Sequence, residues 1–421
     1  MTDPRAAIDA VFRIEFPRLV AALARLTRDV GRAEELAQDA LVVALERWPA
    51  DGVPDNPGAW LMTTAKRRAL DGVRRARIVD AKHEQIARGP DADPRDVAGE
   101  LAETLDDDVG DDLLRLVFTA CHPVLPTEAR VALTLRLVGG LTTAEIARAF
   151  LVPEATIAQR IVRAKRALTE ANVPFEVPRA AERAERLESV LEVIYLIFNE
   201  GHTATAGASL TRPELCDDAV RIARVLAGLV PDEPEVQGLV ALLELSASRL
   251  AARTGPDGAP VLLADQDRSR WDRALMRRGL AAVARADELV AKSGGTAGPY
   301  HLQAAIAAHH ARAATADATE WPRIAALYAL LAERVPSPIV ELNRAVAMAM
   351  AFGPQAGLEL VDALVADGSL DAYHLLPAVR GDLLAKLGRR AEARAEFQRA
   401  AELTRNERER DVLLARARAC E

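Results

Sequence analysis

Apolar side chains recur every three to four positions along most of the chain, the spacing that places them on one face of an α-helix. Residues 5–48 carry two such series, separated by a polar turn at 29–32. Three prolines and a glycine make 49–57 a predicted loop, and the helical spacing resumes over 59–78. The beginning of the chain is therefore predicted to be a small helical domain.

Beyond residue 78, segments with helical spacing of apolar residues alternate with polar segments up to the end of the chain. Residues 88–110 are rich in Asp, Gly and Pro and are predicted to be an acidic linker. Four short helices are expected over 111–172, and helical spacing resumes from 179. Predicted breaks in this last part lie at 254–260, 293–299 and 336–338. Only 4% of the residues are aromatic, which favours packed helices over strands, so we predict an all-α fold.

Domain boundaries follow from these changes in pattern. The predicted segments are a helical domain at 1–87, the linker at 88–110, a second helical domain at 111–173 and a helical extension at 174–421. Within the extension, residues 335–405 show the spacing of small and large side chains that is typical of a tetratricopeptide repeat (TPR). Gly388 follows Gly353 by 35 positions, close to the ~34-residue period of that class. The last unit is marked by Gly381, Leu384, Gly388, Ala393, Phe397 and Ala400.

The segment 141–168 has the pattern of a helix-turn-helix. Thr142 and Glu145 are spaced as a capping box, which predicts a helix from Thr143 to Phe150. After a short turn, Pro153 suits the first position of a second helix, where its missing N–H is not needed. This second helix, predicted over 153–171, has a buried stripe formed by Ile157, Ile161, Ala164 and Leu168.

The opposite face of the second helix carries side chains suited to the major groove of DNA. Gln pairs with adenine, and Arg pairs with guanine or binds phosphate. The first residues of a recognition helix meet base edges and later ones meet the backbone. The predicted base contacts are therefore Glu154, Ala155 and Gln159. The predicted phosphate contacts are Arg160, Arg163 and Lys165.

Two stretches of the chain resemble extracytoplasmic-function (ECF) sigma factors. AEELAQDA at 33–40, continuing to Trp48 and followed by PGAWLMTTAKRRALD at 57–71, resembles region 2 of that family. Residues 125–168 resemble region 4. The order of the stretches and the acidic linker between them also fit. The resemblance implies that the two small domains bind core RNA polymerase and promoter DNA and direct transcription initiation.

The resemblance also implies roles for individual residues. The helix over 33–48 would dock on the polymerase clamp helices through exposed side chains: Glu34, Glu35, Asp39, Glu46 and Arg47. The loop over 49–57 would capture a flipped base of the −10 element. The implied −10 contacts are Asn56, Trp60, Lys66, Arg67, Arg74, Arg75 and Arg77. The helix-turn-helix would read the −35 element.

Three stretches of the extension resemble an ECF subgroup with a long TPR-like C-terminal region. They are VIYLIFNEG at 193–201, DQDRSRWD at 265–272 and GPYHLQAAI at 298–306. The resemblance implies that the extension takes part in control. We expect the extension to contact the sigma domains within the chain and to regulate them, in a direction that the sequence leaves open.

Composition excludes several other classes of protein. The net charge of −8 argues against a protein that coats nucleic acid unaided. Three distant cysteines form no zinc or disulfide motif, so no metal and no cofactor are expected. There is no HExxH, P-loop, GxSxG or GxGxxG motif, so an enzyme is not expected. Without an apolar leader or a long apolar run, a cytoplasmic protein with no membrane contact is expected.

Two alternatives explain part of the sequence. A stand-alone helix-turn-helix transcription regulator with a repeat-type interaction domain accounts for 125–168 but leaves 33–70 without a role. A repeat scaffold leaves unexplained the Lys- and Arg-rich helices predicted over 59–78 and 153–171.

Other polar clusters are interpreted as structural. Gly201 in the segment 199–202 is predicted to end a helix. Asp265, Asp267 and Asp272 are predicted to serve helix entry and to pair with neighbouring arginines. His309 and His310 are predicted to lie at the surface or to line a groove.

Overall fold

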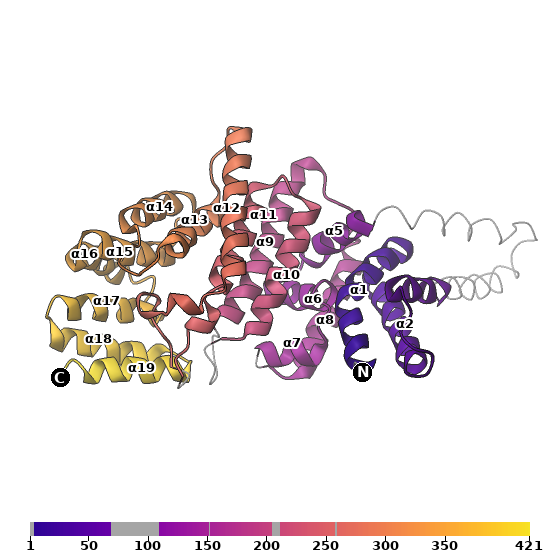
Figure 1. Ribbon diagram of the computed structural model, residues 1–421, viewed down its shortest axis with the longest axis horizontal. Helices are drawn as coiled ribbons and strands as arrows, with labels where there is room; N and C mark the ends of the chain where they lie inside the picture. Colours follow the sequence, from indigo (N-terminus) through magenta and orange to yellow (C-terminus); the bar gives the residue numbers. More distant parts are fainter. Residues whose placement is uncertain (1–3, 69–108, 151, 204–210, 257–258) are drawn as a thin grey trace, which may run out of the picture. The chain divides into compact units, whose positions relative to one another are not determined.

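The structure is a computed structural model, in which the regular structure of the described residues is helical (Figure 1). The described residues are 4–68, 109–150, 152–203, 211–256 and 259–421. Among them, the one β-type pairing is an isolated bridge between Thr254 and Pro260. The predicted all-α fold is confirmed for this part of the chain. The chain divides into two compact units, residues 1–194 and 195–421.

The first unit combines the two predicted small helical domains with the start of the extension. Its helices are α1 (Pro4–Thr27), α2 (Val30–Asp51), a helix over 57–68, α5 (Val109–Ala120), α6 (Thr127–Leu137), α7 (Thr143–Phe150), α8 (Glu154–Glu170) and the first part of α9 (Ala180–His202). Helix α1 packs against both α2 and α5, and α6 packs against α5, α7 and α8. Helices from both sides of the acidic segment therefore share one unit.

Helix α2 begins three residues before its predicted start at Ala33, because Val30 to Arg32 are helical and do not form the predicted turn, and it ends later than predicted. Asp29 caps it by accepting a hydrogen bond from the N–H of Arg32 at 2.9 Å. The helix continues through Pro49 to Asp51, so the prediction of a loop from residue 49 was wrong. Gly52 ends the helix instead: it adopts a φ of +86°, and its N–H donates to the Trp48 carbonyl at 3.0 Å.

The next helix starts at residue 57, two positions before its predicted start. Pro57 can occupy the first turn because the first N–H groups of a helix have no partner within it. The Asn56 side chain accepts a hydrogen bond from the N–H of Ala59 at 3.0 Å, which satisfies one of those groups. The rest of the predicted helix and the predicted linker up to residue 108 lie outside the described residues. The linker was predicted to reach residue 110, but α5 already begins at Val109.

The second unit is a succession of helices joined by short turns. They are α10 (Pro213–Leu229), α11 (Pro234–Ala247), the 3-10 turns η1 (Leu250–Ala252), η2 (Leu263–Asp265) and η3 (Arg268–Arg270), α12 (Arg273–Ser293), α13 (Pro299–Arg312), α14 (Trp321–Arg334), α15 (Pro338–Phe352), α16 (Pro354–Asp367), α17 (Leu375–Lys386), α18 (Arg390–Leu403) and α19 (Glu407–Arg418). From α13 onward each helix packs against the next (Figure 1). The predicted breaks at 293–299 and 336–338 fall between helices.

The residues of the predicted repeats form two helical hairpins, α15–α16 and α17–α18. A Cβ atom on Gly381 would lie 2.9 Å from the Phe397 ring, so only glycine lets α18 approach this closely. Gly353 and Gly388 adopt φ values of +102° and +76° at the turns of the two hairpins. Because the two glycines occupy equivalent turns of the two hairpins, they recur 35 positions apart in the sequence.

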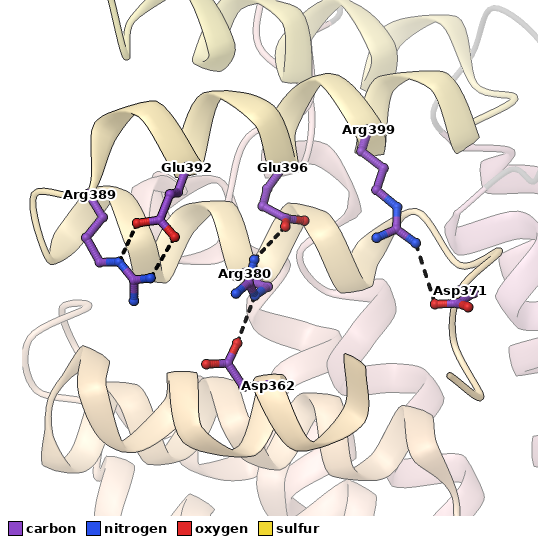
Figure 2. Close-up of polar contacts among 7 residues, drawn as sticks. All are labelled: Asp362, Asp371, Arg380, Arg389, Glu392, Glu396 and Arg399. Carbon is purple, nitrogen blue, oxygen red and sulfur yellow. Dashed lines mark hydrogen bonds and ion pairs between the residues drawn. The ribbon is translucent and has the colours of Figure 1, made fainter. Parts of the chain in front are cut away.

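Ion pairs join three successive helices near the end of the chain. Figure 2 shows Arg380 of α17 donating both to Asp362 of α16, at 2.8 Å, and to Glu396 of α18, at 2.6 Å. Arg389 pairs with Glu392 within the first turn of α18. Exposed pairs contribute little stability, but the two-sided contact of Arg380 fixes how the three helices align.

Candidate nucleic-acid interface

The helix-turn-helix forms as predicted at its first helix. The N–H of Thr142 donates to the Glu145 carboxylate at 2.8 Å, and the N–H of Glu145 donates to the Thr142 hydroxyl at 3.2 Å. This reciprocal pair is a capping box, and it satisfies two N–H groups at the start of α7. Ile146 and Ala147 are buried beneath it. The helix spans Thr143–Phe150, as predicted.

The second helix, α8, starts one residue later than predicted. Pro153 is its N-cap, with extended backbone and no side-chain hydrogen bond, and the helix runs from Glu154 to Glu170. The four predicted core positions are buried, which confirms the apolar stripe: Ile157, Ile161, Ala164 and Leu168. This stripe fixes which face of α8 points away from the domain.

The predicted base-contacting side chains lie on that outward face. Glu154, Ala155 and Gln159 are all exposed. Arg163 is exposed and Arg160 half-buried, and neither forms an ion pair with another residue in the described ranges. Both arginines border a recess of about 260 Å³ between α8 and the start of α6. Their guanidinium groups are therefore available to a phosphate.

Lys165 differs from the other predicted phosphate contacts because it forms an ion pair with Glu34 of α2. The same carboxylate accepts hydrogen bonds from Arg136 at 2.6 Å and from Gln38 at 2.7 Å. Glu34 is only 2% exposed, so the prediction that it is exposed on α2 was wrong. Its burial results from the packing of α2 near α6 and α8 within the first unit, which the pattern of one helix cannot reveal.

The remaining predicted polymerase-binding side chains are exposed along α2: Glu35, Asp39, Glu46 and Arg47. Glu35 pairs with Arg32 at 2.9 Å, and Asp39 pairs with Arg68 at 2.9 Å. Both pairs are exposed, so solvent screens them and a protein partner can replace them at low cost. Apart from Glu34, α2 thus presents the polar face that the sequence predicts.

A recess of about 600 Å³ lies between α2 and the helix over 57–68. It is lined by Val43, Arg47, Ala59, Trp60, Thr63, Thr64, Arg67 and Arg68. Trp60 contacts buried Trp48 edge to face, with ring centroids 5.4 Å apart. The structure therefore brings an aromatic side chain and several guanidinium groups to one surface.

The other predicted −10 contacts are placed differently. Asn56 is exposed and caps the helix, while Lys66 is half-buried near the end of its described part. Arg74, Arg75 and Arg77 lie outside the described residues. Thr63 and Thr64 were not predicted, and their hydroxyls donate to carbonyls of the preceding turn. Nothing in the sequence pattern distinguishes such threonines from ordinary exposed helix residues.

The Cys121–His122 pair is not a reactive site. Cys121 lies 3.2 Å from the Thr134 hydroxyl, and burial raises the pKa of its thiol to about 11. Burial, reinforced by Arg186, lowers the pKa of His122 to about 4. Both side chains are thus neutral at pH 7. In the part of the chain that the structure describes, His, Cys, Asp and Glu side chains do not gather into a metal-binding group.

Helix α9 is hydrogen-bonded to the helix-turn-helix domain within the first unit. Arg186 donates to the Phe118 carbonyl and Ser189 to the Cys121 carbonyl, each at 2.8 Å. The last carbonyls of a helix have no partner within it, so these two side chains complete the end of α5. Arg130 of α6 also pairs with Glu192 at 3.1 Å. The boundary between the units falls at residue 194, inside α9.

Three protein families match successive parts of this chain. Sigma-70 region 2 matches residues 11–78, and sigma-70 region 4 matches residues 115–168. A family of unknown function (DUF6596) matches residues 186–287. Over 408 residues the chain is 44% identical to an uncharacterised protein of Rhizobium meliloti, covering 94% of that protein and 96% of this one.

Better-known relatives match the N-terminal part. Over 155 residues the chain is 31% identical to the ECF RNA polymerase sigma factor SigK of Mycobacterium ulcerans, covering 78% of that protein and 36% of this one. The chain belongs to the ECF RNA polymerase sigma factors. SigK of Mycobacterium bovis strain BCG is 30% identical over the same length. This ECF sigma factor carries, beyond the matched part, a long helical C-terminal region.

Membership of this family accounts for the two small domains. A sigma factor is a DNA-binding protein of transcription initiation, and the helix-turn-helix α7–α8 lies within its region 4. No catalytic family matches the chain. Among the described helices, none is both long and apolar enough to span a bilayer.

Proposed function

We propose that this sigma factor binds core RNA polymerase through the exposed polar face of α2 and directs initiation at promoters whose −35 element is read by α8. One observation carries the proposal: regions 2 and 4 match in order, and the region 4 match ends in a recognition helix with exposed Glu154, Ala155 and Gln159. Arg160 and Arg163 would hold the DNA backbone and position these side chains.

The recess beside Trp60 is the proposed contact with the −10 element. An extruded base loses its stacking partners, at a cost of a few kcal/mol. Trp60 offers an aromatic face on which such a base can stack, and Arg47 and Arg67 border the same recess with positive charge. This arrangement supports base capture during promoter melting.

The ion pair between Glu34 and Lys165 joins the proposed polymerase-binding helix α2 to a proposed DNA contact on α8. Lys165 cannot neutralise a phosphate while its charge is directed at Glu34. We infer that this contact is released when both surfaces engage their partners. We also infer that the helical extension regulates the process, because α9 supplies hydrogen bonds that complete the helix-turn-helix domain.

Run-off transcription with sigma-free core polymerase tests the proposal. We expect transcripts with one defined start that require both the polymerase and the full-length chain. Core polymerase alone, which lacks promoter specificity, is the control. The contrary result would be tight, sequence-specific DNA binding by the chain alone together with no defined starts, which would identify a stand-alone regulator.

Substitutions on α8 should separate base contacts from phosphate contacts. Gln159→Ala should change the preference at one −35 base pair by about 1–3 kcal/mol. Arg163→Ala should weaken all promoters similarly and lower the salt slope of DNA binding by about 1. Arg166→Ala is the matched control, because Arg166 is exposed on the same helix but pairs with Glu170 at 2.6 Å. If transcription from a set of −35 variants is the same for all these proteins, α8 is not the recognition helix.

A further inference from the structure

Positively charged and histidine side chains gather inside the second unit, outside the regions that match sigma factors. Arg249 and Arg253 flank the short turn η1 that follows α11. His202 ends α9, His310 lies in the last turn of α13, and Arg268 lies in η3. These groups are close enough to perturb one another: Arg249 interacts electrostatically with Arg253 and Arg268, and it also acts on both histidines.

Several polar atoms of this cluster have no partner. The guanidinium of Arg249 forms no hydrogen bond and no ion pair with any residue in the described ranges. Arg253 donates through Nη2 to the Thr203 hydroxyl at 3.0 Å, but its buried Nε atom is unpaired. The buried Nε2 of His202 and Nδ1 of His310 are also unpaired. Buried polar groups are almost always hydrogen-bonded, so a group of exceptions in one place indicates a missing partner.

Nearby carboxylates do not supply that partner. Glu409 is the acid that acts electrostatically on Arg253, but it accepts a hydrogen bond from Thr404 at 2.9 Å and pairs with His374 at 3.2 Å. Glu320 pairs at 3.0 Å with His309, the residue that precedes His310. These two acids are thus hydrogen-bonded to other partners, and among the described residues no carboxylate forms an ion pair with Arg249 or Arg253.

The surroundings make this charge costly in the absence of a ligand. Burial, reinforced by repulsion from Arg253, lowers the pKa of Arg249 to about 10. Burial, reinforced by Arg249 and Arg268, lowers the pKa of His310 to about 4. An anion at this place would relieve both the desolvation and the mutual repulsion.

Arg268 and the aromatic residues hold the cluster in place. Arg268 donates to the carbonyls of His310 and Ala313 and lies 4.8 Å from the centre of the Trp271 ring. It therefore positions the end of α13 and is not a free donor. Tyr328 lies within electrostatic range of Arg249, and burial raises the pKa of its phenol to about 12. Its hydroxyl therefore stays protonated and can donate a hydrogen bond.

We propose that Arg249 and Arg253, with His202, His310 and Tyr328, form a binding site for a phosphate group, either free phosphate or the phosphate of a small organic monoester. Two guanidinium groups on one turn suit a doubly charged anion with several acceptor oxygens. The guanidinium N–H groups, the Tyr328 hydroxyl and the two histidine nitrogens together offer more hydrogen-bonding groups than the two oxygens of a carboxylate need, and they suit the three terminal oxygens of a phosphate monoester. The site does not depend on promoter recognition, so this proposal and the function proposed above can be refuted independently of each other.

Calorimetric titration of the full-length chain tests the site. The titrants are inorganic phosphate and glycerol 3-phosphate, with succinate as the carboxylate comparison, all at constant ionic strength. We expect saturable binding of one or both phosphate compounds. Equal affinities would assign free phosphate as the ligand, and tighter binding of glycerol 3-phosphate would assign an organic phosphate. Absence of saturable phosphate binding, or binding of succinate alone, would refute the proposal.

Two substitutions make the test specific. Arg249→Met should weaken phosphate binding by at least about tenfold, because a hydrogen bond to a charged group contributes about that much. The exposed Arg405→Met, in the same unit, is the matched control and should leave binding unchanged. Thermal unfolding without phosphate gives a second measurement. Arg249→Met should raise the unfolding midpoint, because it removes an unpaired, desolvated charge. A lowered midpoint, or unchanged phosphate affinity, would show that Arg249 has a structural role instead.

Discussion

Replacing Glu34 with alanine is expected to lower the free energy of unfolding of the first unit by about 3 kcal/mol. Glu34 is buried, and its carboxylate binds Arg136, Lys165 and Gln38 at once. Removing one member of a buried ion pair leaves the other charges uncompensated, which costs about 3–5 kcal/mol. We expect the lower end of that range because Lys165 retains access to solvent.

Urea unfolding of the full-length chain, followed by circular dichroism, measures this effect. The matched control is Glu35→Ala on the next residue of α2, whose exposed pair with Arg32 should contribute less than about 1 kcal/mol. Equal stability of the two variants would show that the Glu34 contacts do not form in solution. Arg136→Met provides an independent check, since it breaks the same cluster without changing a predicted polymerase contact.

The helix-turn-helix could be predicted from the sequence because its signals are local. Thr142 and Glu145 are three residues apart, and their hydrogen bonds close within one turn. The apolar stripe of α8 likewise repeats within one helix. The burial of Glu34 could not be predicted, because Arg136 is 102 positions away in sequence. A carboxylate on the polar face of one helix gives no sign that another domain covers it.

The predictions made for Gly201 and for the aspartates of 265–272 show the same limit of local sequence patterns in the extension. Gly201 was predicted to end a helix, but α9 continues past it to His202. A Cβ atom on Gly201 would lie 2.7 Å from the backbone nitrogen of Cys216, so this glycine allows α10 to approach. As predicted, Asp267 and Asp272 cap the starts of helices: their side chains accept hydrogen bonds from backbone N–H groups of η3 and α12. The predicted ion pairs of these aspartates with neighbouring arginines do not form among the described residues: Arg268 and Arg270 donate to backbone carbonyls instead.

The sequence also identified fragments of the cluster around Arg249 without relating them to one another. His202, Arg268 and His310 belong to three separate motifs, and each has an ordinary structural interpretation when it is considered alone. The turns of the second unit bring these residues near Arg249 and Arg253, which no motif includes. Long-range packing therefore decides whether a polar residue is structural or part of a site.

A chain that ends at residue 179 is expected to be less stable than one that ends at residue 202, by at least about 3 kcal/mol. The shorter chain lacks the hydrogen bonds of Arg186 and Ser189 to the end of α5, each worth about 1 kcal/mol. It also lacks buried apolar side chains of α9 such as Leu187, each worth about 1.5–3 kcal/mol. Urea unfolding of the two chains measures the difference, and Ser189→Ala in the full chain should reproduce about 1 kcal/mol of it.

Equal stability of the two truncated chains would show that α9 does not complete the helix-turn-helix domain. The same pair tests regulation when it is assayed by run-off transcription beside the full chain. If the extension controls the sigma domains, the chain ending at 202 should differ from the full chain in the amount of promoter-specific transcript. The regulatory proposal fails if these two chains transcribe alike in every condition and if the two units of the full chain unfold independently, since α9 would then connect them without transmitting any effect.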